Sequence, residues 1–186
     1  MPDMLDKLYE LPDAAPALKA AGILVWRANA REQHALAEWV RPRFGVVWAI
    51  QRRLDRGCEV ALEQRPVTYF TAVKPVSGQP AGARPADRLL GFACDDVAGR
   101  GVFGATGVQE DYRGRGTLAS LAGRVRVGTG LLLACRHTMR AEVYPYAVTD
   151  AAGPVDFYIK TVRATVIAGS DTSTPRRAQR GSEPQP

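Results

Sequence analysis

The stretch 102–116 constrains the fold of this chain more than any other. An apolar run punctuated by glycine leads into a basic, glycine-rich turn, and helix-compatible sequence follows. A strand that leads into the start of a helix suits an anion, because backbone N–H groups point at the ligand and the helix dipole favours negative charge. Two arginines add phosphate-binding forks and two glycines permit close backbone approach: Arg113, Arg115, Gly114 and Gly116. The stretch therefore predicts a pyrophosphate held at the end of a strand.

Two motifs resemble those of the GCN5-related N-acetyltransferases (GNAT). The first, Val108-x-x-x-Tyr112-Arg113-Gly114-x-Gly116, resembles the acyl-CoA-binding signature. The second, Gly153-Pro154-x-x-Phe157-Tyr158-x-Lys160, resembles the Tyr-bearing helix near the C-terminus. Both come in the expected order and at roughly the expected separation. The resemblance is clear over about 89–168 and fainter from Gly22 onward.

The resemblance implies an α/β fold with a mixed, mostly antiparallel central sheet flanked by helices, the acyl-CoA N-acyltransferase fold. It implies an N-acetyltransferase that moves an acetyl group from acetyl-CoA to a primary amine of an unidentified small molecule or peptide. Direct attack in a ternary complex would need positioning and carbonyl polarisation from the protein. The implied partners are acetyl-CoA and the amine acceptor, with the protein a monomer or homodimer and no membrane involved.

Site residues follow from the same resemblance. Tyr158 would protonate the departing CoA thiolate, and a phenol of pKa near 10 suits a thiolate of similar basicity. Backbone groups of Val108 would pair with the pantetheine amides and polarise the thioester carbonyl. The cofactor-binding set is Val108, Arg113, Gly114, Arg115, Gly116, Thr117, Gly128 and Gly130. The chain departs from the family at Arg163, near which the family usually has a glycine.

The glycine-rich turn is interrupted by an insertion. The segment 117–127 stands where the family has about one residue, and a continuous helix through it would turn the downstream face about 80° out of register. In the arrangement that we favour, 114–117 hold the pyrophosphate and a helix over 117–127 breaks at Gly128. In a second arrangement, 113–127 bulge outward and Gly128-Thr129-Gly130 cap the helix. A third alternative is a catalytically degenerate CoA-binding or structural relative.

Composition limits the class of protein. The 186 residues, 46% of them apolar, suit one domain with a proper core, and no run approaches a membrane span. We expect a single domain over 1–170, with an N-terminal extension over 1–21, a surface loop over 75–88 and a disordered tail over 171–186. The first residues lack a basic segment followed by an apolar one, so we do not expect secretion. Three widely spaced cysteines lead us to expect free buried thiols in a reducing cytoplasm.

The net charge of +6 suggests one alternative to an enzyme, which is a basic nucleic-acid-binding domain. The arginines are spread along the chain without aromatic interleaving, so this alternative is disfavoured. His34 and His137 lack partners at ligand spacing, so no metal is expected. The general base stays open among Asp95, Asp96, Glu110, Asp111 and Glu142, or a water relay, and Cys135 is expected in the core.

The pattern along the chain predicts alternating elements. The order is a strand, two helices, three to four antiparallel strands, a helix, a strand, a helix and a strand. Expected strands are a buried one at 23–27 and others at 58–62, 67–73, 89–95, 102–109, 141–148 and 165–168. Four helices are expected. The first follows an Asn29/Glu32 capping box and ends near Pro42, and the second covers 46–57 and stops at Gly57. The third follows Gly128, and the fourth covers 154–161.

Overall fold

The computed structural model describes residues 1–44, 48–74, 89–113 and 126–171. Its strands are β1 (Met4–Lys7), β2 (Leu24–Arg27), β3 (Tyr69–Val73), β4 (Leu89–Asp95), β5 (Val102–Val108), β6 (Tyr146–Thr149) and β7 (Thr165–Val166). Its helices are α1 (Ala15–Ala20), α2 (Gln33–Phe44), α3 (Trp48–Glu63), α4 (Val127–Ala141) and α5 (Val155–Val162). Short 3₁₀ turns lie at Leu8–Glu10, Ala30–Glu32 and Glu110–Tyr112. The segments expected to be a surface loop (75–88) and a disordered tail (from 172), and most of the insertion, lie outside the described residues.

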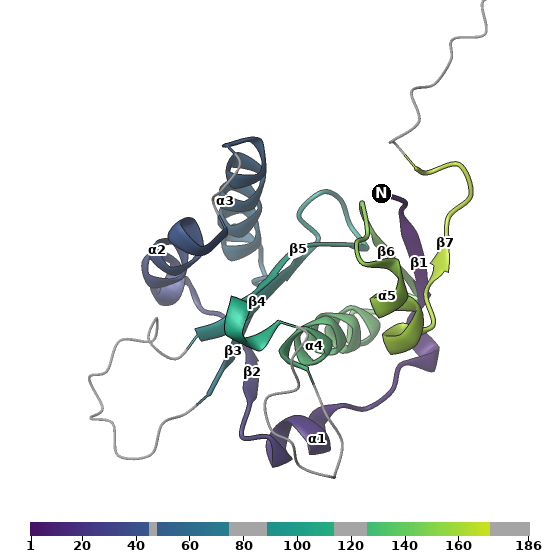
Figure 1. Ribbon diagram of the computed structural model, residues 1–186, viewed down its shortest axis with the longest axis horizontal. Coiled ribbons are helices and arrows are strands. Elements are labelled where there is room, and N and C mark those ends of the chain that lie inside the picture. The colour runs from purple at the N-terminus through teal and green to yellow at the C-terminus, as the bar shows by residue number, and fades with distance from the viewer. Residues whose placement is uncertain (45–47, 75–88, 114–125, 172–186) are drawn as a thin grey trace, which may run out of the picture.

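The strands form one seven-stranded sheet in the order β2-β3-β4-β5-β6-β1-β7 (Figure 1). Every neighbouring pair is antiparallel except β5 and β6, which are parallel. The mixed, mostly antiparallel sheet flanked by helices is therefore confirmed. Its parallel pair follows from the crossover through α4, since parallel strands need a long connection.

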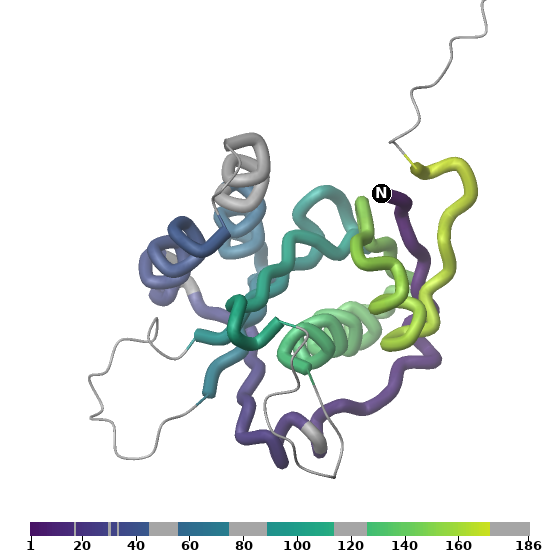
Figure 2. The backbone as a smooth tube through the Cα atoms, in the orientation of Figure 1, coloured from purple at the N-terminus to yellow at the C-terminus, as the bar shows by residue number. Residues whose placement is uncertain are grey.

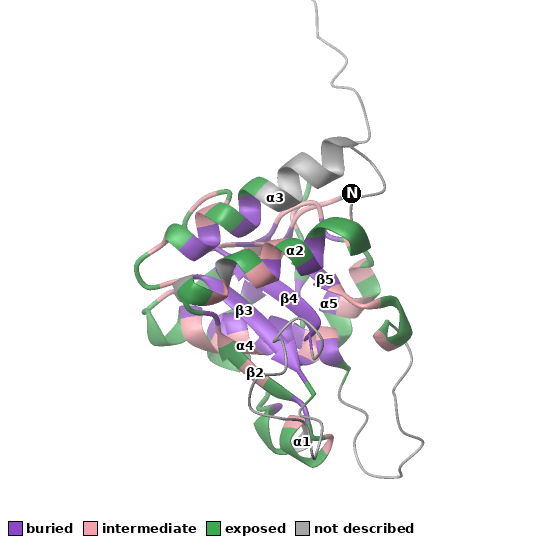
Figure 3. Cartoon of the chain, turned by 90° about the vertical axis from the view of Figure 1, so that its left-hand side faces the viewer, coloured by how far each residue is buried: buried purple, intermediate pink, exposed green. Residues whose placement is uncertain are grey.

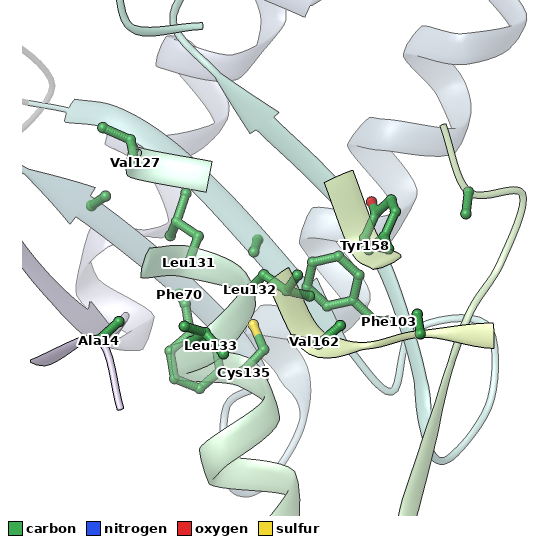
Figure 4. Packing of buried hydrophobic residues seen from close by; sticks show 14 of the residues in the cluster. Ala14, Phe70, Phe103, Val127, Leu131, Leu132, Leu133, Cys135, Tyr158 and Val162 are labelled. Atoms are coloured by element: carbon green, nitrogen blue, oxygen red, sulfur yellow. The ribbon is translucent and has the colours of Figure 1, made fainter. Parts of the chain in front are cut away.

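Helices cover both faces of the sheet, so its central strands are buried throughout and mostly apolar. All residues of β3 and β4 are buried, as expected for strands packed on both sides. On one face, α4 packs Leu131, Leu132 and Cys135 against the sheet (Figures 1 and 4). On the other face, a second cluster contains Trp39 of α2 and Cys58 and Leu62 of α3. Figure 3 shows the buried sheet between the two helical layers.

The N-terminal segment is part of the sheet, which corrects the expectation of an extension before the first strand. β1 pairs with both β6 and β7, and Met4 and Asp6 are fully buried. In Figure 2 this first strand runs beside the last one. A four-residue strand that buries a carboxylate gives no clear alternation of apolar and polar residues, so sequence patterns missed it.

The strand expected at 58–62 is wrong, because α3 continues through Gly57 to Glu63. Cys58 and Leu62 are buried and Glu59 and Glu63 are exposed, at a spacing of four that also fits a strand. Gly57 does not end the helix. A Cβ there would lie 3.4 Å from Val97 Cγ1, an ordinary contact with the turn after β4.

Other boundaries shifted for identifiable reasons. The strand expected at 141–148 begins only at Tyr146, because α4 runs to Ala141. β2 is not buried, since it is the edge strand of the sheet and leaves Trp26 37% exposed. The capping box is confirmed: Asn29 N donates to Glu32 Oε2 at 2.9 Å. The helix after it extends past Pro42 to Phe44.

Candidate functional site

The two parallel strands diverge soon after they meet. β5 and β6 are in register only at Val102↔Val148 and Phe103↔Thr149. β6 ends at Thr149, whereas β5 continues to Val108. Within the described residues, the second half of β5 therefore has a strand partner on one side only, which is β4. Its backbone groups on the β6 side need other partners.

An irregularity in β5 lies at this divergence. Three steps of β5, from Phe103 to Thr106, oppose two steps of β4, from Asp95 to Ala93, which is the signature of a bulge. Gly104 lies in the bulge with a φ of 151°, a conformation that glycine adopts readily. Such bulges bend a strand and redirect its polar groups, here next to a cavity.

The backbone of Val108 points toward the diverged side. Gln109 N donates to Leu90 O of β4 at 2.8 Å. Since consecutive backbone groups of an antiparallel strand point to opposite sides, Val108 directs its N–H and C=O away from β4. Val108 O accepts a hydrogen bond from Arg113 Nε at 2.6 Å, which fits this direction. The Arg113 guanidinium also lies over the Phe44 ring, 5.4 Å from its centroid.

A cavity of about 480 Å³ occupies the space between the diverging strands and α5. It is lined by Phe44, Phe103, Thr106, Gly107, Val108, Tyr112, Arg113, Arg126, Gly128, Leu132, Gly153, Pro154, Phe157 and Tyr158. We call it the first cavity. It brings together residues of both sequence motifs, including Val108, Arg113 and Gly128 from the cofactor-binding set and the catalytic candidate Tyr158.

The start of α4 forms one end of the first cavity. The helix begins at Val127, with Arg126 before it in extended conformation and no described side chain capping its N-terminus. Gly130 N already bonds to Arg126 O at 3.0 Å, so the N–H groups without a partner inside the helix are those of the residues before it. A helix start of this kind attracts anions. The helix continues through Gly128, so Gly128 does not break a helix, and residues 114–125, on which the choice between the two expected arrangements depends, lie outside the described residues.

The remaining cofactor candidates are not placed in the first cavity. Gly130 faces α1 instead, and a Cβ there would come within 2.5 Å of Leu18 Cδ2. Gly114, Arg115, Gly116 and Thr117 lie outside the described residues.

Tyr158 of α5 is buried, with 4% of its surface exposed, in the same hydrophobic cluster as Phe103 and Leu132 (Figure 4). Burial raises the pKa of its phenol above the ordinary value, and the Arg136 guanidinium opposes this increase. The phenol therefore keeps its proton at neutral pH. Phe157 contacts Tyr158 edge to face at a centroid distance of 5.1 Å.

A second cavity of about 340 Å³ adjoins the first. Both are lined by Phe103, Thr106, Gly153 and Tyr158. The other residues around the second cavity are mostly small and apolar, such as Val97, Ala105 and Ala151. Tyr158 and the bulge of β5 thus stand in the wall common to two cavities.

None of the five carboxylates considered as a general base lines either cavity. Asp95 is 2% exposed, and burial, followed by Asp96 and Glu142, raises its pKa to about 7. Glu142 pairs with Arg27 at 2.8 Å. The carboxylate in the second cavity is Asp150, which sequence reasoning missed. Its position directly after β6, where the strand ends, is the feature of the sequence that could have identified it.

Histidines and cysteines lie apart from the cavities. Exposed His34 pairs with Glu38 at 3.3 Å, and His137 Nε2 lies 2.9 Å from Pro12 O. All three cysteines, Cys135 among them, are free and buried. Among the residues that the structure describes, no cluster of three or more His, Cys, Asp or Glu could hold a metal ion. Nor does that part of the chain contain a helix long and apolar enough to span a membrane.

Comparison with known proteins identifies the fold. The sequence matches no family model and no curated protein. The structure resembles the GCN5-related glucosamine N-acetyltransferase region of a fungal multi-domain GH3 β-N-acetylglucosaminidase, with a TM-score of 0.62 and 14% identity over 89% of this chain and 19% of that one. It also resembles a GCN5-related N-acetyltransferase from Sphaerobacter thermophilus, with a TM-score of 0.55 and 16% identity over 89% of this chain and 48% of that one. The chain thus spans less than half of either protein.

The chain has the fold of the GCN5-related N-acetyltransferases, as the two sequence motifs predicted.

Proposed function

We propose that this chain is an N-acetyltransferase that uses acetyl-CoA to acetylate a primary amine. The observation that carries the proposal is the divergence of β5 from β6 beside a cavity lined by Val108 and Tyr158. Diverging strands leave backbone donors and acceptors unpaired, and an extended amide-bearing arm such as pantetheine supplies matching groups. The fold supports the same activity.

Acetyl-CoA would enter the first cavity from the start of α4. Its pyrophosphate would lie at this helix N-terminus, where the dipole and the N–H groups without a partner inside the helix favour negative charge. Arg126 and Arg113, both exposed and both lining the cavity, would supply guanidinium groups. Arg113 would then exchange its bond to Val108 O for a phosphate oxygen, which frees that carbonyl for a pantetheine amide.

The acceptor amine would reach the thioester through the second cavity. Its nitrogen lone pair attacks the carbonyl carbon, whose oxygen is polarised by the Val108 N–H. The C–S bond then breaks, the proton of the Tyr158 phenol passes to the CoA sulfur, and the nitrogen loses a proton to water. Tyr158 suits this role because it borders both cavities and keeps its proton.

The proposal is tested in two steps. Acetyl-CoA should raise the melting temperature of the protein, because binding to the native state alone stabilises it by mass action. CoA thiol release should then be measured across amines, peptides and aminoglycosides. Binding with thiol release supports the enzyme, and binding without it on any acceptor supports a degenerate CoA-binding relative. No shift at millimolar acetyl-CoA would exclude the cofactor assignment.

A further inference from the structure

Arg136 is the largest fully buried side chain of the described residues. It lies in α4 on the apolar side that faces the sheet, with 0% of its side chain exposed. A guanidinium taken out of water is costly unless charges and hydrogen bonds compensate it. Its partners therefore indicate why an arginine occupies a core position.

The guanidinium contacts three neighbouring strands. It forms an ion pair with Asp6 of β1, which is equally buried. Its Nη2 donates to Thr149 Oγ1 of β6 at 2.6 Å. Its Cζ lies 4.9 Å from the centre of the Phe103 ring of β5. One side chain of α4 thus contacts β1, β6 and β5, from the face of the sheet that α4 covers.

These contacts lie where the parallel strands part. Phe103 and Thr149 form the last registered pair of β5 and β6. Phe103 borders both cavities, whereas Thr149 borders only the second. A hydrogen bond from a fixed guanidinium to Thr149 holds β6 at the point from which β5 continues alone.

Stability by itself does not account for this ion pair. Asp6 Oδ1 and Arg136 Nε find no hydrogen-bond partner within the described part of the chain. Buried ion pairs can often be replaced by apolar residues without loss of stability, so a pair with unmet bonds points to a geometric role.

We propose that Arg136 is a positioning residue that fixes the angle at which β5 and β6 diverge, and with it the width of the acetyl-CoA cavity. The inference rests on the proposed function for its ligand.

Thr149→Val tests the proposal, because it removes the hydroxyl at nearly constant volume and Thr149 does not line the first cavity. Amide hydrogen exchange over 102–108 and 146–149 should accelerate, and acetyl-CoA should bind about tenfold more weakly, as expected for loss of one hydrogen bond to a charged group. Thr149→Ser should restore both. Thr71→Val is the matched control, since Thr71 is also buried but lies on β3.

A second variant guards against loss of fold. Asp6→Leu/Arg136→Met replaces the pair by apolar residues and should fold, yet show the same faster exchange and weaker binding. If Thr149→Val matches Thr71→Val in exchange and in affinity, the positioning role is wrong. If the wild-type protein does not bind acetyl-CoA, the proposed function fails. The exchange measurement then still decides whether Arg136 holds the strands.

Discussion

Arg163 occupies a backbone conformation that suits glycine. It follows α5 with φ 55° and ψ 34°, the left-handed region in which many helices end. The family motif usually has a glycine near this point, a residue that adopts this conformation without strain. A side chain with a Cβ is destabilising in this conformation by about 1 kcal/mol.

Arg163→Gly should therefore raise the free energy of unfolding by about 0.5–1 kcal/mol. Urea denaturation measures the change. Arg163→Ala is the control, since it removes the charge but keeps the Cβ. Equal stabilisation by both substitutions would mean that charge, not backbone strain, is responsible.

Asp95 makes stability depend on pH. Its pKa in the folded protein is about 7, against 3.8 for an ordinary aspartate, because burial and the neighbouring Asp96 and Glu142 disfavour the charge. The folded state therefore binds the proton more tightly than the unfolded chain. The contribution is full below pH 4 and is lost as the pH rises through about 7.

Asp95→Asn should remove the loss of stability that the wild type shows as the pH rises. At pH 8 the free energy of unfolding of the variant should exceed that of the wild type by a few kcal/mol, since a pKa shift of one unit corresponds to about 1.4 kcal/mol. Unfolding free energies between pH 5 and pH 8 measure it. Asp111→Asn, at an exposed position, is the control. Parallel pH curves for the wild type and Asp95→Asn would contradict the assignment.

If the proposed role is right, Tyr158→Phe should lower kcat about 100-fold or more and leave acetyl-CoA affinity nearly unchanged, because the phenol would act only as the thiolate leaves. Tyr112→Phe is a matched control in the same cavity. Steady-state kinetics with an identified acceptor give the result. Turnover within about twofold of the wild type would show that Tyr158 is a packing residue and not the acid.

At the scale of elements, the first turn of α4 contains two glycines with different surroundings. A Cβ on Gly128 would meet only ordinary contacts, 3.6 Å from Val108 Cγ2, whereas one on Gly130 would clash with Leu18. Gly128 faces the first cavity and Gly130 faces α1. Substitutions at these two positions should therefore distinguish an effect on ligand binding from an effect on helix packing.

Gly128→Val should fill part of the first cavity and weaken acetyl-CoA binding about tenfold or more, with a small change in melting temperature. Gly130→Ala should lower the melting temperature but leave the affinity of the folded protein nearly unchanged. Calorimetry and thermal denaturation give both values. The opposite pattern would move the anion site away from the start of α4, to the segment 114–117.

At the scale of the whole molecule, the first strand joins the two C-terminal strands into one sheet. β1 lies between β6 and β7, and its Asp6 pairs with Arg136 of α4. Removing residues 1–7 would leave β7 without a neighbour and the Arg136 charge buried without its partner, which is strongly destabilising. This truncated chain should show no cooperative thermal transition.

Removing 172–186 is the control for that truncation. The sequence of this segment contains few apolar residues to bury, so its loss should leave the melting temperature unchanged. Circular dichroism during heating compares both chains with the wild type. A cooperative transition in the chain without residues 1–7 would mean that β1 is dispensable.

Local signals in the sequence determined much of this protein. The apolar run 102–108, the capping box at Asn29 and the helix after Pro154 were predicted because strand alternation, caps and prolines act within a few residues. The two motifs predicted the fold, and four of the site residues that the resemblance implied line the first cavity: Val108, Arg113, Gly128 and Tyr158. Where two periodicities fit equally, as at Cys58–Leu62, the sequence could not choose between helix and strand.

The tertiary structure alone decided what depends on residues distant in sequence. The place of β1, the parting of β5 from β6, and the burial of Arg136 against Asp6 and Thr149 all arise from contacts between separate elements. The contact of Gly130 with Leu18 of α1 likewise joins elements that the sequence separates. Burial and pairing are properties of the assembled core, and so a charge such as that of Arg136 acquires its role only once the strands that surround it have met.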